Sequence, residues 1–201
     1  MSSNKKISTR KLTVTGMMVA ITMLLAYSPL GIIPLQPVSA TTTHIPTIIA
    51  AILEGPFVGA ITGLSFGLVS MFKAITQPTS VLSPCFVNPL VSLLPRVCIG
   101  LVAGDAYRFL VHLDKRGAFA AILASALGSL TNTLGAMGMI YVLYVKTLTE
   151  QMGTAAGPVI WGIIITYGVM EMLAAAVICT GVVLAVKKAM FPSGVQAMKN
   201  H

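Results

Sequence analysis

Charged residues are scarce in this sequence. They make up 9% of its 201 residues, whereas 56% are hydrophobic and the mean hydropathy is +0.90. A soluble domain carries about 25% charged residues because its surface faces water. The composition therefore excludes a water-soluble protein and predicts an all-α integral membrane protein. Each crossing needs about 20 apolar residues, so a single domain over residues 1–201 has room for five or six helices.

Sequence motifs for nucleotide hydrolysis and metal binding are also missing. The chain contains no G-x-x-x-x-G-K-[ST] loop and no H-E-x-x-H. Its three cysteines show no C-x-x-C spacing, its three histidines are scattered, and its five acidic residues never pair in sequence. We therefore expect no catalytic residues, no metal and no cofactor. A membrane enzyme or a purely structural partner stays an open alternative, since residues distant in sequence can meet in the fold.

The positive charge is present but concentrated in a few places. The formal charge is +8, which would suggest nucleic acid in a soluble protein, yet the placement favours membrane topology. With an even number of spans, ten basic residues share one side, which the positive-inside rule makes cytoplasmic, and Lys73 and Lys146 lie toward the other. Both termini are then cytoplasmic and no nucleic-acid partner is expected. The ten are Lys5, Lys6, Arg10, Lys11, Arg108, Lys115, Arg116, Lys187, Lys188 and Lys199.

The apolar runs predict six transmembrane helices. Small residues within them predict close helix contacts, which in lipid take the place of a hydrophobic driving force. Gly59, Gly63 and Gly67 recur at intervals of four, and Gly16 and Ala20 form a G-x-x-x-A step that suits either internal packing or a partner. The expected spans are 12–29, 44–53, 57–76, 84–104, 118–146 and 158–189.

Two polar residues interrupt the fourth expected span. Arg96 is the stronger functional candidate, because a cation inside the bilayer costs about 2.5–3.5 kcal/mol and is normally turned toward a cavity or an anionic partner. Asn88 lies eight residues earlier, within roughly 80° of Arg96 on one continuous helix, so both are expected to face the same cavity. Pro89 and Pro95 interrupt the hydrogen-bond ladder and predict a bend beside both residues.

Further polar residues point to recognition of a small polar molecule. Asn132 lies inside the fifth span, and Trp161 and Glu171 lie inside the sixth. Arg96 and Glu171 admit two interpretations: they neutralise one another as a buried pair, or Arg96 meets a substrate anion while Glu171 bonds elsewhere. Three prolines oppose regular structure in the loop at 28–43, which predicts a cover for the pocket mouth, with Gln36 and His44 beside it. A buried cation and two amides favour an anionic ligand with hydroxyl or amide groups.

Two segments carry a family resemblance. TTTHIPTIIAAILEGPFVGAITGLSFGLVSMFKA and FVNPLVSLLPRVCIGLVAG, with their HIP, EGP, FGL and NPLVSLLPR elements, resemble the substrate-binding S component of energy-coupling factor (ECF) vitamin transporters, and most closely the pantothenate-binding branch. The resemblance covers essentially the whole chain. It implies a multi-pass plasma-membrane protein that captures a vitamin on the outer side and works with a transmembrane coupling subunit and two cytoplasmic ABC-type ATPases.

The resemblance also implies roles for individual residues. Gly16 and Ala20 occupy the place of the family's coupling face, where the pattern is often Ala-x-x-x-Ala. Pantothenate has a carboxylate, an amide and two hydroxyls, which Arg96 and the two asparagines can answer. Few aromatic residues lie near the site, which argues against flat rings that need stacking. Riboflavin or cobalamin remains the alternative vitamin. The resemblance implies substrate-binding roles for Gln36, His44, Asn88, Arg96, Asn132 and Trp161. With Glu171, the acid inside the sixth span, these are the predicted substrate-binding residues.

Overall fold

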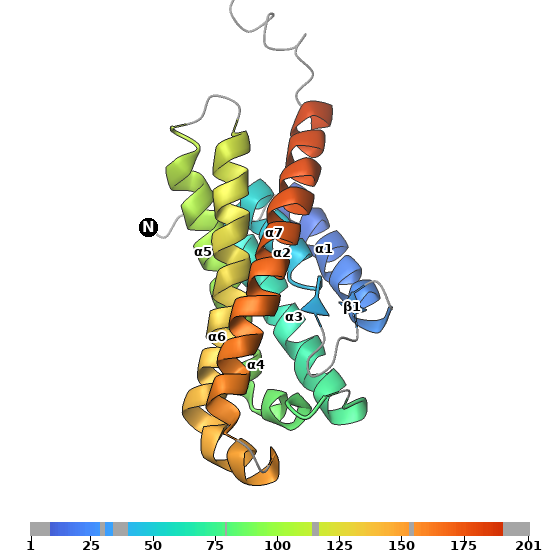
Figure 1. Cartoon of the computed structure of the whole chain (residues 1–201). Helices are drawn as coiled ribbons and strands as arrows, with labels where there is room; N and C mark the ends of the chain where they lie inside the picture. The colour runs from blue at the N-terminus through green and yellow to red at the C-terminus, as the bar shows by residue number, and fades with distance from the viewer. Residues whose placement is uncertain are drawn as a thin grey trace, which may run out of the picture.

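The computed structural model describes residues 9–28, 31–33, 40–78, 80–113, 117–152 and 155–190. These residues are almost entirely helical (Figure 1), as the composition predicts. Five helices are long and apolar enough to cross a membrane, with α4 and α5 taken together as one of them. The helices are α1 (Thr9–Tyr27), α2 (Ile45–Glu54), α3 (Pro56–Thr76), α4 (Pro89–Ser92), α5 (Leu94–Leu110), α6 (Ala118–Met152) and α7 (Ala156–Met190), with the 3-10 helix η1 (Ser83–Val87) before α4.

Two antiparallel strands of two residues each lie between α1 and α2. Strand β1 (Ile32–Ile33) pairs with β2 (Ala40–Thr41), so that Ile32 lies opposite Thr41. Gln36 falls between the strands and lies outside the described residues. The strand pair brings Thr41 to the position just before α2.

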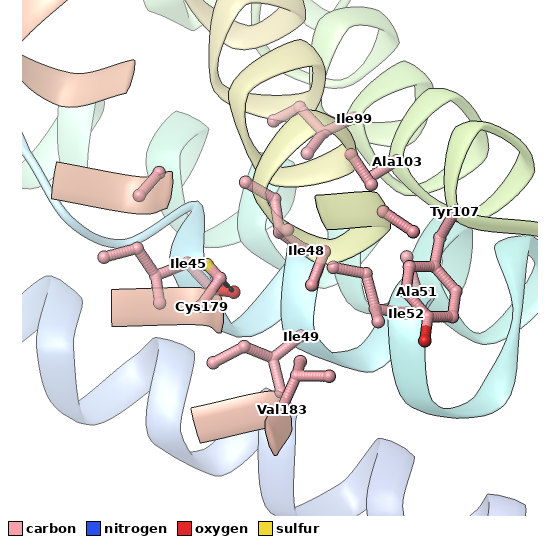
Figure 2. Packing of buried hydrophobic residues seen from close by; sticks show 14 of the residues in the cluster. Ile45, Ile48, Ile49, Ala51, Ile52, Ile99, Ala103, Tyr107, Cys179 and Val183 are labelled. Atoms are coloured by element: carbon pink, nitrogen blue, oxygen red, sulfur yellow. Dashed lines mark hydrogen bonds between the residues drawn. The ribbon is translucent and has the colours of Figure 1, made fainter. Parts of the chain in front are cut away.

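Helix α2 is the centre of the bundle. Its ten residues would span roughly 15 Å, half of a bilayer core. Eight of the ten are buried, which is the pattern of a helix that is apolar all round and enclosed by others. Figure 2 shows Ile48 between Ile99 of α5 and Val183 of α7, and each of these three side chains is fully buried. The expected span at 44–53 is therefore an interior helix about which the longer helices pack.

Helices α3 and α5 touch through their glycines, as the interval of four predicts. A carbon added at Gly63 would overlap the carbonyl oxygen of Arg96, and one at Gly67 would lie 2.8 Å from the carbonyl oxygen of Ser92. Gly100 of α5 fits in the same way against Gly59 of α3. Backbones this close leave no room for any side chain, so the prediction of a close helix contact is confirmed.

The fourth expected span is divided where its prolines lie. Asn88 is in an extended conformation between η1 and α4, and Leu93 separates α4 from α5. Pro89 begins α4 and Pro95 lies in the first turn of α5, positions where a missing N–H costs no helical bond. The predicted bend is confirmed, and α5 then continues to Leu110, beyond the expected end at 104.

Helices α6 and α7 form a long antiparallel hairpin along one side of the molecule (Figure 1). Each has 35 residues, which is roughly 50 Å and longer than the bilayer core of about 30 Å. The sequence analysis places a loop from residue 147 onward, but α6 continues to Met152 because residues 147–152 contain neither glycine nor proline. The helical hairpin therefore extends past the expected span ends.

The α3–α5 contact predicts a steric effect on stability. We expect Gly63→Ala to lower the free energy of unfolding by about 1–3 kcal/mol, because the added methyl meets a backbone carbonyl that cannot rotate away. The measurement is the thermal unfolding midpoint of the detergent-purified protein. Gly162→Ala on α7 is the matched control, since a carbon there meets nothing within 4 Å. Equal midpoints for the two variants would contradict this packing.

Candidate ligand-binding site

A cavity of about 140 Å³ lies between the strand segment, α3, η1, α5, α6 and α7. Its lining contains three charged side chains: Lys73 of α3, Arg96 of α5 and Glu171 of α7. Asn132 and Thr133 of α6 add polar groups, and apolar side chains make up most of the remaining wall. Apolar walls with a few placed polar groups are the usual character of a small-molecule site.

A backbone carbonyl earlier in the chain and two aromatic rings position the side chain of Arg96. It is 5% exposed, and its guanidinium carbon lies 5.4 Å from the centre of the Phe66 ring and 5.1 Å from that of Phe86. Its Nη1 donates to the carbonyl oxygen of Val91 at 3.0 Å. In a continuous helix this carbonyl would bond to residue 95, but Pro95 has no N–H to give. The proline thus frees an acceptor that the arginine side chain uses.

A donor of the Arg96 side chain is unused within the described residues. Within the described part of the chain, its Nε is buried without a hydrogen-bond partner. A guanidinium carries five N–H donors in a planar fork, and Val91 occupies a single position of that fork. A buried cation with unused donors can bind a carboxylate through charge-assisted hydrogen bonds.

Glu171 is bonded to protein groups instead. Its Oε1 accepts from the backbone N–H of Thr41 at 2.6 Å and from the Thr41 hydroxyl at 3.3 Å, and its Oε2 accepts from the Thr133 hydroxyl at 3.2 Å. The ion pair found among the described residues is that of Arg10 Nε with Glu54 Oε1, at 2.7 Å, so Arg96 and Glu171 form none. Of the two interpretations, the geometry matches the one in which Glu171 bonds elsewhere.

Asn132 also presents unused hydrogen-bonding capacity at the cavity. It is 5% exposed and lines the cavity, yet its Oδ1 has no partner among the described residues. An amide oxygen accepts hydrogen bonds, so it suits a hydroxyl or an N–H on a ligand. Arg96, Asn132 and Glu171 are therefore the predicted site residues that the structure brings together.

Three other predicted residues lie outside the described lining. Asn88 caps α4 by accepting from Leu90 N–H at 3.0 Å, and its amide donates to the Tyr144 hydroxyl at 3.0 Å. The angle expected between Asn88 and Arg96 assumes that both lie in one continuous helix, whereas Asn88 is an extended residue that precedes α4. His44 is buried at 1% exposure but does not reach the cavity, and Trp161 is 54% exposed.

Lys73, Phe66 and Phe86 are cavity residues that the sequence analysis does not identify. Phe66 and Lys73 are seven residues apart on α3, which places them on one helix face with Ser70 between them. That spacing is a readable signal once Phe66 is known to face the cavity. Phe86 lies in η1 and carries no comparable pattern.

One pattern in α3 resembles a hydrolase motif in its letters alone. Residues 63–67 read G-x-S-x-G, which in a nucleophile elbow forms a sharp turn between a strand and a helix. Here the five residues lie inside α3, and the Ser65 hydroxyl donates to the carbonyl oxygen of Ile61 at 3.2 Å. This serine is a helical residue bonded to its own backbone, away from the cavity.

The expected partner residues lie on the open side of α1. Gly16 and Ala20 are both exposed, and a carbon added at Gly16 meets no atom within 4 Å. Their G-x-x-x-A step is therefore not used for packing within the described chain. Only 11% of the apolar window of α1 is buried.

Comparisons with known proteins agree on one family. A family model described as "ECF transporter, substrate-specific component" matches residues 10–186, a range that contains every cavity residue named above. The pantothenate transporter PanT of Leuconostoc mesenteroides subsp. mesenteroides is 33% identical over 148 residues, covering 70% of this chain and 69% of that protein. The pantothenic acid transporter PanT of Lactococcus lactis subsp. cremoris is 29% identical over 167 residues, covering 76% and 80%.

The position of Asn88 predicts a structural role, and two substitutions separate its helix cap from its bond to Tyr144. Asn88→Ala removes both the cap of α4 and the bond to Tyr144, and we expect it to lower the free energy of unfolding by about 1–2 kcal/mol. Asn88→Asp keeps the capping oxygen and should cost less. Thermal unfolding of both variants tests this, with Tyr144→Phe removing the same bond from its other end. An Asn88→Ala protein as stable as the parent would contradict the assignment.

Proposed function

The chain belongs to the family of ECF transporter substrate-specific components, and on that basis we propose that it binds pantothenate for import across the cell membrane. It is accordingly a multi-pass plasma-membrane protein and a transporter component, not an enzyme. In the proposed binding mode, the pantothenate carboxylate bonds to Arg96, while the hydroxyl and amide groups meet Asn132 and the polar groups beside it.

The state of Arg96 is the observation that carries this proposal. Its guanidinium is buried with unused donors, a condition that costs free energy unless an acceptor arrives. Glu171 is already satisfied by Thr41 and Thr133, so it does not consume those donors. A ligand carboxylate supplies both the negative charge and the acceptor oxygens that the cation lacks.

Two further observations favour pantothenate over a flat-ringed vitamin. The relatives at 33% and 29% identity are named as pantothenate and pantothenic acid transporters. In addition, the two rings nearest the cavity cation, Phe66 and Phe86, both lie against the guanidinium of Arg96. Rings engaged with the cation are less free to stack on riboflavin. Riboflavin and cobalamin remain the alternatives for the same kind of transporter component.

The membrane arrangement and the partners belong to the same proposal. Six membrane segments, with α2 as the short second one, and cytoplasmic termini agree with the ten basic residues assigned to one side. A transmembrane coupling subunit and two cytoplasmic ATPases would supply the energy. Gly16 and Ala20 would contact the coupling subunit, because their small side chains permit close helix approach and no described residue covers them.

The proposal is tested by binding measurements on the detergent-purified protein. We expect saturable binding of pantothenate, and we expect Arg96→Met to weaken it roughly 30-fold or more, since loss of one partner of a buried charge pair costs about 2–5 kcal/mol. Arg108→Met is the matched control, because Arg108 is an exposed arginine on the same helix and lies outside the cavity lining. Thermal unfolding establishes that both variants are folded.

The outcomes separate the alternatives. Normal pantothenate binding by folded Arg96→Met would refute the anion site. Saturable binding of riboflavin or cobalamin in place of pantothenate would keep the transporter component and change its vitamin. Folded protein that binds none of the three vitamins would favour the hypothesis of a structural partner. Folded protein that chemically converts a substrate would favour the hypothesis of a membrane enzyme.

A further inference from the structure

Lys73 is a second cation at the same cavity, for which the proposed binding mode gives no role. It lies in the last turn of α3 and lines the cavity with Arg96 and Glu171. Phe66, which contacts Arg96, is seven residues earlier on the same helix face, or about 10 Å along the axis.

The ammonium group of Lys73 is held at present by the end of α1. Its Nζ donates to the carbonyl oxygen of Ala26 and lies 5.7 Å from the centre of the Tyr27 ring. Ala26 is in the last turn of α1, where carbonyl groups have no partner within the helix and carry the negative end of the helix dipole. These are contacts of a neutral acceptor and a ring face, both weaker for a cation than a carboxylate would be.

The charge balance of the cavity favours an anion. Its described lining holds two cations, Lys73 and Arg96, against the carboxylate of Glu171, which gives a net charge of +1 if all three are ionised. Glu171 makes its hydrogen bonds to Thr41 and Thr133 and leaves both cations without a carboxylate in contact. A ligand with a single negative charge would balance the excess.

We propose that Lys73 is the second cation for the ligand carboxylate, and that it exchanges its bond to the end of α1 for a bond to the ligand. This inference rests on the proposed function. It assigns to Lys73 the discrimination between an acid and a neutral molecule of the same shape. It also links the occupied cavity to α1, the helix that carries Gly16 and Ala20.

The test compares two ligands that differ at one group: pantothenate, and the neutral alcohol in which a CH₂OH group replaces its carboxylate. Dissociation constants for both are measured on the full-length protein and on Lys73→Met. We expect the preference for the acid over the alcohol to fall roughly fivefold or more, because a charge-assisted bond is lost for the acid alone. Lys73→Arg retains the charge and should retain most of the preference.

Lys146→Met is the matched control, since it removes another lysine from the expected outer side at an exposed position that is not in the cavity lining. Its preference should equal that of the parent. If Lys73→Met does not fold, Lys73→Gln keeps a donor for the Ala26 carbonyl and answers the same question. An unchanged preference in a folded variant, or an equal loss for both ligands, would overturn the inference. Parent protein that binds no pantothenate would refute the proposed function, and this inference with it.

Discussion

The contact between Gly63 and the backbone of Arg96 sets the arrangement on which the cavity depends. A cation inside an apolar bundle must have both a fixed backbone and groups that tolerate its charge. The glycine contact holds α5 directly against α3, and this in turn places Phe66 of α3 beside the guanidinium. Arg96 therefore combines a main chain packed directly against a glycine with a buried side chain that has an unused hydrogen-bond donor.

Pro95, Arg96 and Glu171 determine which polar groups near this contact have hydrogen-bond partners. Pro95 leaves the carbonyl of Val91 without a helical donor, and Arg96 supplies one from its side chain. Glu171, in contrast, accepts hydrogen bonds from Thr41, in the segment before α2, and from Thr133 of α6. The Glu171 carboxylate has hydrogen-bond partners on both oxygens and connects these elements. The Arg96 guanidinium has a donor without a partner among the described residues. The proposed anion site rests on this asymmetry.

Much of this arrangement is readable from the sequence. The interval of Gly59, Gly63 and Gly67 predicts the α3–α5 contact, the prolines predict the break, and the cost of burying Arg96 predicts a cavity around it. The errors have two physical causes. Asn88 is misplaced because helical periodicity applies only within a helix, and Asn88 is an extended residue before α4. Lys73 is missed because its partner Ala26 is distant in sequence.

The bond between Glu171 and Thr41 joins residues that are 130 positions apart in the chain. During synthesis the strand segment and α2 leave the ribosome long before α7 does, and contacts this distant form late because the intervening chain must first be ordered. A nascent chain that has inserted every helix except α7 would contain Arg96 and its glycine support, but no carboxylate to hold Thr41. Under the proposed function, completion of the ligand site would then coincide with insertion of the last helix, so a truncated or stalled chain would lack the complete proposed site.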